Sequence, residues 1–422
     1  MSRPIPTFDP SCMDEYDPTS LAVEAALERI ATGIRTVAGT ERVAIRTALD
    51  RVLAEPVRSP IDVPSHTNSA MDGYALPGGA LANGSVRLRV VGTSWAGRPF
   101  AGAVGADECA RIMTGGVLPA GTDTVVIQER VRLEGEHAVF DGADARPGDN
   151  VRAAGEDLTA GSVVLEPGDR IGPAELGILA SVGVIEITVH RRLRVAFFST
   201  GDELRSLGEA LEAGSVYDSN RYTLHGMLRR LGVEAIDMGV VRDRREDVER
   251  AFRDASAVAD AIITSGGVSV GEADFVKETL ERQGQVDFWK IAMKPGRPLA
   301  FGRVGEAVFF GLPGNPVSVM VTFYQFVQPA LRRMMGERAA TVPRVRVKSA
   351  TRLRKRTGRV EFQRGVLGTD EAGDAIVSTT GAQGSGILSS MHGADCFIIL
   401  PMESAGVEAG ELVEVQPFHG IV

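Results

Sequence analysis

The segment from about residue 191 to residue 340 alternates between short apolar runs and amphipathic stretches, and this alternation constrains the fold more than any other feature. The runs typical of buried strands are RVAFFST, EAIDMGVV, DAIITSG, DFWKIAM and AVFFGLP, and helical patterns lie near 219–231, 244–257, 273–283 and 316–335. Strands that alternate with helices form a largely parallel sheet, which binds ligands at the carboxyl ends of its strands. We therefore predict a central α/β domain with a ligand site at that edge.

Two regions on either side of this segment have a different character. Between residues 61 and 149, short alternating runs are split by glycine and proline, which is typical of a small β-domain. After residue 341, the runs RVRVKSATRL, VEFQRGVL, CFIIL and LVEVQPF indicate a second β-region. These runs predict a small barrel or sandwich at the C-terminal end.

The length of 422 residues is too great for one ordinary hydrophobic core. Helical patterns at 21–34, with Thr19 or Ser20 as cap, at 48–53 and at 173–181, with Pro173 in the first turn, lie outside the β-like regions. We predict a multidomain α/β plus β protein with two to four domains. The regions of different character are 1–60 together with 150–190, then 61–149, 191–340 and 341–422.

Composition excludes several classes of partner and site. The net charge of −9 argues against a nucleic-acid binder, which normally has a basic face. Cys12, Cys109 and Cys396 are far apart and form no CxxC pair, which indicates a reducing compartment and argues against structural zinc. No apolar run approaches the about 18 residues that a membrane span needs, and the N-terminus lacks the apolar core of a signal peptide. We expect a cytoplasmic protein with no nucleic-acid or membrane partner.

The run SGGVSVGEAD, from Ser265 to Asp274, lies between an apolar strand and a helical pattern. A strand, a glycine-rich turn and a helix together cradle oxyanions, because glycines let backbone N–H groups converge and the helix N-terminus adds partial positive charge. Glu272 and Asp274 end the run, and carboxylates beside a phosphate cradle are typical of a divalent metal site. The candidate binding residues of the turn are Ser265, Gly266, Gly267 and Ser269.

Polar residues follow the other predicted strands as well, and a parallel sheet brings all such loops to one edge. Lys290 and Lys294 are four residues apart, a spacing that places both side chains on one face of a strand, and Arg297 completes a cationic cluster suited to oxyanions. The run GLPGNPVS is a further candidate anion-binding site, where Asn315 can cap, Pro316 fits the first helical turn and Ser318 offers a hydroxyl near the free N–H groups. The candidate carboxylates of this edge are Glu203 and Asp243.

Three loops of the N-terminal half are further candidates. Asp72 lies in a polar turn before a β-run, Thr114 lies in the glycine turn IMTGG, and RAAGEDL contains Arg152 and Asp157. Their own chemistry fits either function or plain turns. The six histidines show no HxxxH or HExxH spacing, and neither a GxSxG elbow nor a Walker loop occurs in the sequence.

Several long strings, in order from about residue 60 to residue 365, resemble one family. They are DVPSHTNSAMDGYA, RIMTGG, RAAGEDL, FSTGDEL, YDSNRY, TSGGVSVGEAD, FWKIAMKPGRP, GLPGNPVSVMVTFYQFVQP and EFQRG. This text is similar to the MoeA-type molybdopterin molybdenumtransferases, which include the gephyrin E domain. One departure is Arg297, where many relatives have lysine. Arginine keeps the charge but offers a planar fork.

The resemblance implies a homodimer whose subunits have an elongated linker and dimerisation domain, an inserted β-domain, a MogA-like α/β domain and a C-terminal β-barrel. It implies Mg²⁺-dependent insertion of molybdate into adenylylated molybdopterin, with hydrolysis of the adenylyl phosphoanhydride and release of AMP. Asp274, Glu203 and Asp243 would be the metal-side and catalytic carboxylates. Lys290, Lys294, Arg297 and Ser318 would hold molybdate and the pterin phosphate. Asp72, Thr114, Arg152 and Asp157 would complete the cleft from the second domain, and Arg364 and Ser389 would add to the oxyanion site.

Two other functions fit parts of the sequence. The related molybdopterin adenylyltransferase shares the α/β domain and the glycine loop, but the flanking domains and the strings NSAMDGYA and GEDL argue against it. A non-catalytic scaffold, as in gephyrin's anchoring of receptors, has no need of the acidic residues that this chain retains. The sequence leaves open whether an adenylyltransferase partner delivers the adenylylated pterin, and whether tungstate replaces molybdate.

Overall fold

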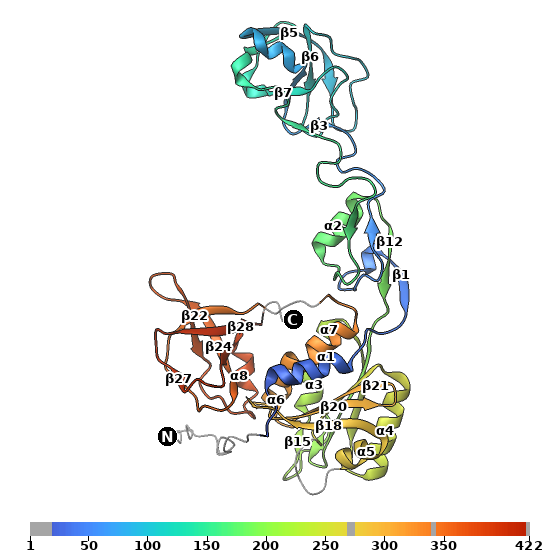
Figure 1. Ribbon diagram of the computed structural model, residues 1–422, viewed down its shortest axis with the longest axis vertical. Helices are drawn as coiled ribbons and strands as arrows, with labels where there is room; N and C mark the ends of the chain where they lie inside the picture. The colour runs from blue at the N-terminus through green and yellow to red at the C-terminus, as the bar shows by residue number, and fades with distance from the viewer. Residues whose placement is uncertain (1–18, 268–274, 339–342, 419–422) are drawn as a thin grey trace. The chain divides into compact units, whose positions relative to one another are not determined.

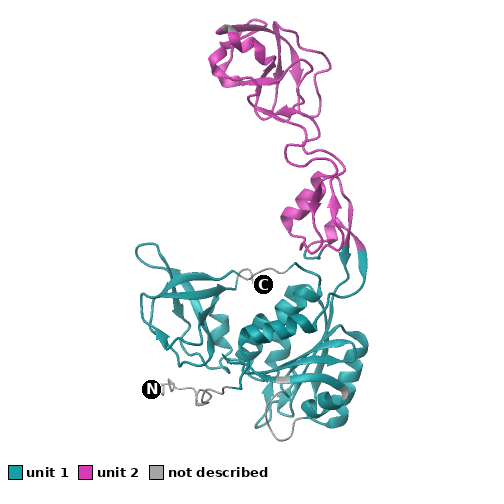
Figure 2. Ribbon diagram, in the orientation of Figure 1, with its two compact units in different colours: residues 1–41, 50–52, 189–422 teal, residues 42–49, 53–188 magenta. Residues whose placement is uncertain are grey.

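The computed structural model describes residues 19–267, 275–338 and 343–418 (Figure 1). The chain forms two compact units, and each is described by itself (Figure 2). Unit 1 contains residues 1–41, 50–52 and 189–422, and unit 2 contains residues 42–49 and 53–188.

A six-stranded sheet forms the centre of unit 1. Its strands, in spatial order, are β16 (Glu234–Val241), β13 (Arg194–Thr200), β17 (Ala261–Ser265), β21 (Ala307–Leu312), β20 (Pro298–Val304) and β18 (Gly284–Lys290). The first four are parallel, and β20 is antiparallel to both of its neighbours, so β18 again runs with the first four. The predicted, largely parallel sheet is confirmed. The sequence analysis missed β20, because its residues follow the PGRP turn directly.

Helices cover both faces of this sheet (Figure 1). Phe197 and Phe198 are neighbours in β13, and because successive strand residues point to opposite faces they belong to different hydrophobic cores. One core includes side chains of α1 (Val23–Gly33), α3 (Ser219–Leu231), α6 (Pro316–Thr322) and α7 (Gln328–Met334). The other includes side chains of α4 (Arg245–Val258) and α5 (Phe275–Gln283).

The long C-terminal helix of this domain is not uniform. A helix was predicted near 316–335, and a π-helical segment, Phe323–Val327, separates α6 from α7 within that range. Pro329 has no N–H to donate to the carbonyl four residues earlier, which favours a local widening of the helix.

Two local predictions near the N-terminal end are wrong. Helix α1 begins at Val23 with Ala22 at the N-cap position, so neither Thr19 nor Ser20 caps it. Residues 48–53 form no helix, and the only helical turn in this stretch of the described chain is a short 3₁₀ turn just before them, Ile45–Thr47. Asp50 has a positive φ of 63°, which breaks a helical path at that point.

The C-terminal region is a closed five-stranded barrel, as predicted. The strands are β24 (Val360–Thr369), β25 (Ala375–Thr379), β22 (Val345–Ser349), β28 (Leu412–Pro417) and β26 (Cys396–Leu400), and pairing of β26 with β24 closes the barrel. A short strand, β19 (Met293–Lys294), pairs with β24. The run DFWKIAM is therefore not one strand: its first part ends β18 at Lys290, and its last residue begins β19.

Unit 2 contains the predicted β-domain. Its sheet has the order β7 (Thr124–Ile127), β4 (Gly73–Leu76), β6 (Glu108–Ile112), β5 (Ser85–Ser94), β9 (His137–Asp141) and β8 (Arg132–Glu134). Two small ladders lie outside this sheet, β3 (Asn68–Ser69) with β10 (Val151–Arg152), and β2 (Val57–Arg58) with β11 (Val163–Leu165). Helix α2 (Pro173–Ser181) has Pro173 in its first turn, as expected.

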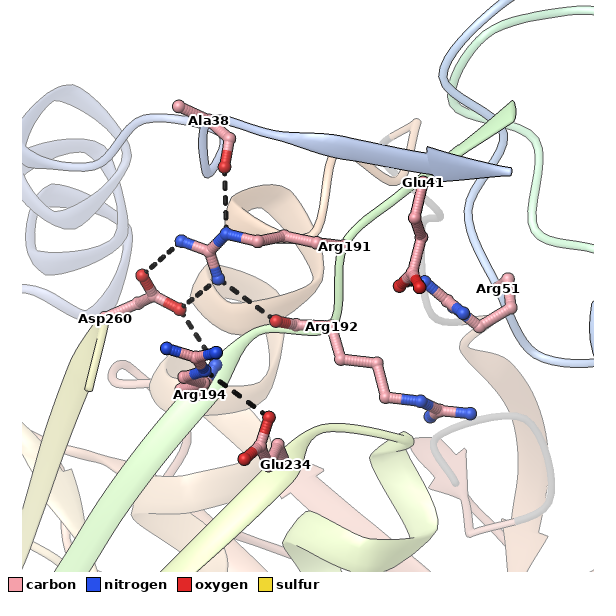
Figure 3. Close-up of polar contacts among 8 residues, drawn as sticks. All are labelled: Ala38, Glu41, Arg51, Arg191, Arg192, Arg194, Glu234 and Asp260. Atoms are coloured by element: carbon pink, nitrogen blue, oxygen red, sulfur yellow. Dashed lines mark hydrogen bonds and ion pairs between the residues drawn. The ribbon is translucent and has the colours of Figure 1, made fainter. Parts of the chain in front are cut away.

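A polar network fixes the strand ends at the amino edge of the unit 1 sheet (Figure 3). The two terminal guanidinium nitrogens of Arg191 donate to the Asp260 carboxylate, at 2.6 and 2.8 Å. The backbone N–H of Arg194 donates to the same carboxylate at 2.8 Å. Burial alone would raise the pKa of Asp260, but these hydrogen bonds and the arginine charges outweigh it and lower the pKa. The ligand edge of the sheet lies at the opposite ends of the strands.

The thiols of the described residues are inert. Cys109 and Cys396 are buried and free, and burial raises the pKa of each to about 12. Cys12 lies outside the described residues. Among the helices that the structure describes, none has the length and apolar character to cross a membrane.

Candidate active site

The carboxyl ends of five strands meet at one edge of the unit 1 sheet, because β16, β13, β17, β21 and β18 share a direction. The loops after these strands carry most of the predicted site residues. In spatial order, the edge has carboxylates after β16 and β13, a glycine turn after β17, Asn315 after β21 and Lys290 at the end of β18. The edge therefore has carboxylates at one end, with Arg242 and Arg244 on either side of Asp243 in the same loop, and Lys290 at the other end.

The carboxylates at the first end of this edge are Asp202, Glu203 and Asp243. The Asp243 N–H donates to Asp202 Oδ1 at 3.3 Å, which joins the loops after β13 and β16. Glu203 folds back over Gly201: a Cβ on that glycine would lie 2.5 Å from Glu203 Oε2. Partial burial and the charges of Asp202 and Glu203 raise the pKa of Asp243. Three mutually repelling carboxylates suit a bound cation.

The structure does not complete a metal site from these groups. Across residues 19–267, 275–338 and 343–418, no group of three or more His, Cys, Asp or Glu side chains is arranged to hold a metal ion. Two of the predicted metal ligands, Glu203 and Asp243, belong to loops that the Asp202–Asp243 hydrogen bond joins. The third, Asp274, lies outside the described residues, as does Ser269.

The glycine turn after β17 has no room for side chains. Gly266 and Gly267 have φ values of +88° and +67°, and a Cβ on Gly267 would lie 2.5 Å from Val276 Cγ2. A Cβ on Gly266 would lie 2.7 Å from the Thr200 carbonyl. Both positions therefore require glycine, as the oxyanion-cradle prediction expects. Ser265 Oγ accepts a hydrogen bond from Asn220 Nδ2 at 2.8 Å, so this hydroxyl is held in place.

The two predicted lysines belong to different sheets. Lys290 ends β18 in the α/β sheet, whereas Lys294 lies in β19, which pairs with the barrel strand β24. Two residues separate the strands, so the expectation of one strand face is wrong. The Arg297 carbonyl accepts a hydrogen bond from the N–H of Ile291 at 2.7 Å, which closes the turn from Ile291 to Arg297. Lys294 Nζ lies 3.2 Å from Glu361 Oε1.

Asn315 connects the α/β domain to the barrel rather than capping its own helix. It occupies the N-cap position of α6 without a side-chain cap, and its Nδ2 donates to Ser385 Oγ at 3.1 Å. The Ser385 carbonyl accepts the N–H of Val317 at 3.0 Å, so the barrel loop takes over the capping role. Pro316 is in the first turn as predicted, and Ser318 is buried in that turn.

Arg364 is a fully buried residue of β24. Its Nε donates to Ser390 Oγ at 3.1 Å, and a terminal nitrogen donates to the Gly384 carbonyl at 3.2 Å. Ser389, the predicted partner, begins helix α8 (Ser389–His392) and is exposed. The arginine thus holds the loop around Gly384 in place, and Ser390 rather than Ser389 contacts it.

A cleft of about 1480 Å³ opens beside Lys294, between the barrel loop that includes Ser385 and the turn before β24. Six basic and three acidic side chains line it: Lys294, Arg352, Arg354, Lys355, Arg356 and Arg359, against Glu361, Glu408 and Glu411. Lys355 donates to the carbonyls of Met402 and Ser404 and so anchors the turn. The cleft is a basic surface in an acidic protein and suits a polyanionic ligand.

The candidate residues of unit 2 are partly brought together. Asp72 Oδ1 accepts hydrogen bonds from the N–H and the hydroxyl of Thr114, at 2.7 and 2.8 Å. These bonds lower the pKa of Asp72. Arg152 pairs with Asn68 across β10 and β3, and its side chain is exposed. The exposed Asp157 bonds through its N–H to the Val63 carbonyl, at 2.9 Å.

Three family models match this chain in succession. They are the MoeA N-terminal region (domain I and II) over residues 21–183, a probable molybdopterin binding domain over 196–333, and the MoeA C-terminal region (domain IV) over 346–418. A molybdopterin molybdenumtransferase from Haemophilus influenzae is 45% identical over 384 residues, which cover 91% of this chain and 95% of that relative. The chain belongs to the molybdopterin molybdenumtransferase family.

Other members of the molybdenumtransferase family agree with this assignment. A gephyrin from Dictyostelium discoideum is 33% identical over 89% of this chain and 59% of its own length. The crystal structure of a molybdopterin biosynthesis moeA protein from Pyrococcus horikoshii OT3 has a TM-score of 0.82 at 27% identity, over 94% of this chain and all of that one. The multidomain arrangement of α/β sheet and C-terminal barrel is therefore the fold of this family.

Sequence reasoning missed several residues of this candidate site. Asp218, in the string YDSNRY, caps α3 and accepts a hydrogen bond from Ser199 at 3.1 Å, while Asn220 ties Ser265 to the Gly314 carbonyl. Within the described ranges, Thr200 Oγ1 and Asn220 Oδ1 are buried without a hydrogen-bond partner, which suits a polar ligand or water at the turn. The basic lining of the cleft was also missed, although the run RLRKRTGR signals it in the sequence.

Proposed function

We propose that this chain inserts molybdenum from molybdate into adenylylated molybdopterin, with Mg²⁺-dependent hydrolysis of the adenylyl phosphoanhydride and release of AMP. The observation that carries the proposal is the set of groups along one sheet edge: three carboxylates, a glycine turn without room for side chains and Lys290, with a basic cleft beside Lys294 on the barrel. Both substrates are anions and the reaction also cleaves a phosphoanhydride, so it needs a cationic pocket and a carboxylate corner together.

Glu203 and Asp243, with Asp274, would hold Mg²⁺. Burial, and after it the charges of Asp202 and Glu203, raises the pKa of Asp243, and a bound cation would favour its ionised form. The metal would supply positive charge beside the phosphoanhydride. Ionised carboxylates of this corner would orient the attacking water and accept its proton. The bond from the AMP phosphorus to the bridging oxygen then breaks, and AMP leaves.

The cationic end would hold the oxyanions. Lys290, Lys294, Arg297 and Ser318 would bind molybdate and the pterin phosphate, and the basic cleft extends this surface along the barrel. The glycine turn, with Ser265, would approach the phosphates closely, because no side chain intervenes. The two dithiolene thiols then bind molybdenum in place of one oxo group, and that oxygen leaves as water with the two thiol protons.

We further propose a cytoplasmic homodimer in which residues 1–60 and 150–190 form the elongated dimerisation domain and residues 191–340 the MogA-like domain. In such a dimer Asp72, Thr114, Arg152 and Asp157 would complete the catalytic and binding groups. Arg364 would act through the Gly384 loop, and Ser389 would line the oxyanion site. Sedimentation at several concentrations tests the dimer, and a monomer at the highest concentration would contradict it.

The deciding experiment is AMP release from adenylylated molybdopterin, with and without molybdate and Mg²⁺. Release that depends on both supports the molybdenumtransferase reaction. ATP consumption with plain molybdopterin, and no AMP release, would instead identify an adenylyltransferase. A chain with neither activity would be a binding or scaffold protein.

A further inference from the structure

One edge of the unit 2 sheet aligns three residues across neighbouring strands. Gly73 of β4 pairs with Ile112 of β6, and Ile112 pairs with Ser94 of β5. Because β4 is antiparallel and β5 parallel to β6, the next residues at this edge are Asp72, Met113 and Trp95. Adjacent strands lie about 4.8 Å apart, so the backbones of Trp95 and Asp72 are about 10 Å apart, a span that one fused-ring ligand bridges.

The turn that carries Trp95 is rigid. Trp95 and Arg98 exchange two backbone hydrogen bonds of 3.0 Å, and the N–H of Phe100 donates to Ser94 Oγ at 3.3 Å. The ring of Phe100 lies on Gly92, where an added Cβ would be only 2.3 Å from it. The backbone position of Trp95 is thus fixed, which lowers the entropy that a ligand must overcome on binding.

Trp95 is 46% exposed, and Met71, beside Asp72 in the chain, is 45% exposed. Single exposed apolar residues are ordinary on protein surfaces. Here Met71 adjoins Asp72 in the chain, Trp95 lies one strand beyond Met113 at the same edge, and the Thr114 turn adjoins the Trp95 turn: a Cβ on Gly115 would be 3.9 Å from the Cβ of Ala96. The corner therefore combines an aromatic face with a hydrogen-bonding group, as a flat heterocycle requires.

The second oxygen of the Asp72 carboxylate, Oδ2, determines which heterocycle this corner can bind. Asp72 Oδ1 accepts from Thr114, and no other described residue donates to Oδ2. A carboxylate only accepts hydrogen bonds. The aminopyrimidinone edge of a pterin presents adjacent N–H donors, whereas the Watson–Crick edge of adenine presents a donor next to an acceptor. The carboxylate therefore matches the pterin and not the adenine of the substrate.

We propose that Trp95 stacks on the pterin ring of the substrate while Asp72 Oδ2 accepts hydrogen bonds from the N–H edge of that ring. This assignment rests on the proposed function. Aromatic stacking on a heterocyclic base is worth about tenfold or more in affinity. Trp95 is then a substrate-binding residue of unit 2, in addition to the residues that the sequence analysis selected.

The test is a fluorescence titration of the full chain with pterin-6-carboxylate and, separately, with AMP. The chain has two tryptophans, and Trp289 is only 9% exposed, so Trp95 dominates quenching by a ligand. A parallel titration of Trp95→Leu corrects for the loss of fluorescence that arises only because the pterin absorbs light. We expect pterin-6-carboxylate to quench Trp95 and AMP to leave it unchanged.

Calorimetry on the variants supplies a second readout. Trp95→Leu should weaken pterin binding about tenfold, whereas Trp95→Phe should stay within about threefold, because a phenyl ring still stacks. Leu133→Ala is the matched control, since Leu133 is 54% exposed on β8 of the same sheet. Unchanged pterin affinity in Trp95→Leu, or quenching by AMP in place of pterin, would overturn the assignment. Trp95-dependent pterin binding by a chain that releases no AMP would support it and contradict only the proposed reaction.

Discussion

Lys294 and Glu361 are register partners that join the α/β domain to the barrel. They pair across β19 and β24, and Lys294 Nζ lies 3.2 Å from Glu361 Oε1. Glu361 is only 8% exposed, and both side chains line the basic cleft. The ion pair fixes the ammonium group at the cleft wall, so Glu361 is a positioning residue for the predicted oxyanion site.

Glu361→Gln should lower kcat/KM for molybdate insertion about tenfold, because loss of one charge-assisted hydrogen bond costs about 1.5 kcal/mol of positioning. Steady-state kinetics with varied molybdate measure this effect. Glu414→Gln is the control, since its partner Arg344 and Glu414 itself are substantially exposed and outside the cleft. Equal losses in the two variants would show that Glu361 does not position Lys294.

Asp202→Asn should move the acid limb of the activity profile to lower pH. Burial, then the charges of Asp202 and Glu203, raise the pKa of Asp243 above its ordinary value. A protonated Asp243 cannot bind a cation, so activity should fall as pH drops through that raised pKa. Removal of the Asp202 charge lowers the pKa of Asp243. The measurement is AMP release from pH 4 to pH 8, and an acid limb that stays in place would exclude coupling between these carboxylates.

Gly267→Ala should abolish most activity. The new Cβ would lie 2.5 Å from Val276 Cγ2 at a φ of +67°, so the turn after β17 must shift. Gly208→Ala introduces the same kind of strain, at a φ of +91°, with no atom within 4 Å. It should cost about 1 kcal/mol of stability and leave activity near normal. Denaturant melts and AMP release on both variants separate the two effects, and a fully active Gly267→Ala would refute the tight cradle.

The sequence predicted the parts of the fold that depend on periodicity. The continuous apolar run RVAFFST located β13, because helices bury both faces of this sheet. Alternation in RVRVKSATRL located β22, because only one face of that strand is buried. The strand β20 and the split between β18 and β19 were not predictable in this way. They depend on the turn at Gly296, where a Cβ would be 2.5 Å from Thr322 Oγ1, and on pairing with β24, far along the chain.

The candidate site likewise contains residues that local sequence predicts and partners that only tertiary contacts determine. The glycines at 266 and 267 were predictable, since their local geometry requires glycine. The partners of Asn315 and Arg364 were not: Ser385 of a barrel loop and Ser390 of α8 are about 70 and 26 residues away in the sequence. Tertiary contacts of this kind follow from strand pairing and leave no local pattern.

Arg354→Ala with Arg356→Ala should raise KM for the anionic substrate about fivefold at low salt. Both side chains are exposed on the wall of the cleft, and two lost charges weaken attraction to a polyanion. The difference from the unmodified chain should shrink in about 0.5 M salt, where the screening length is only about 4 Å. Arg346→Ala, on exposed β22 outside the cleft, is the control. A salt-independent effect would point to a fold defect instead.

Asp260→Asn should destabilise unit 1 by about 2 kcal/mol at pH 7, because it removes a bidentate, charge-assisted pair with Arg191.

The sign of the pH dependence of this effect follows from the lowered pKa of Asp260. A carboxyl group whose folded pKa is depressed stabilises the fold above its unfolded pKa of about 4 and loses that contribution as pH falls through the folded pKa. The difference in the free energy of unfolding between Asp260→Asn and the unmodified chain should therefore be full at pH 7 and shrink below about pH 4.

Urea denaturation across this pH range measures the difference, with Glu234→Gln as the control from the same network (Figure 3). The pair of Glu234 with Arg194 is more than half exposed, so that variant should cost less than about 0.5 kcal/mol at any pH. Equal costs for the two variants, or a difference that stays undiminished from pH 7 to pH 3, would contradict the role of Asp260 in fixing the amino edge of the sheet.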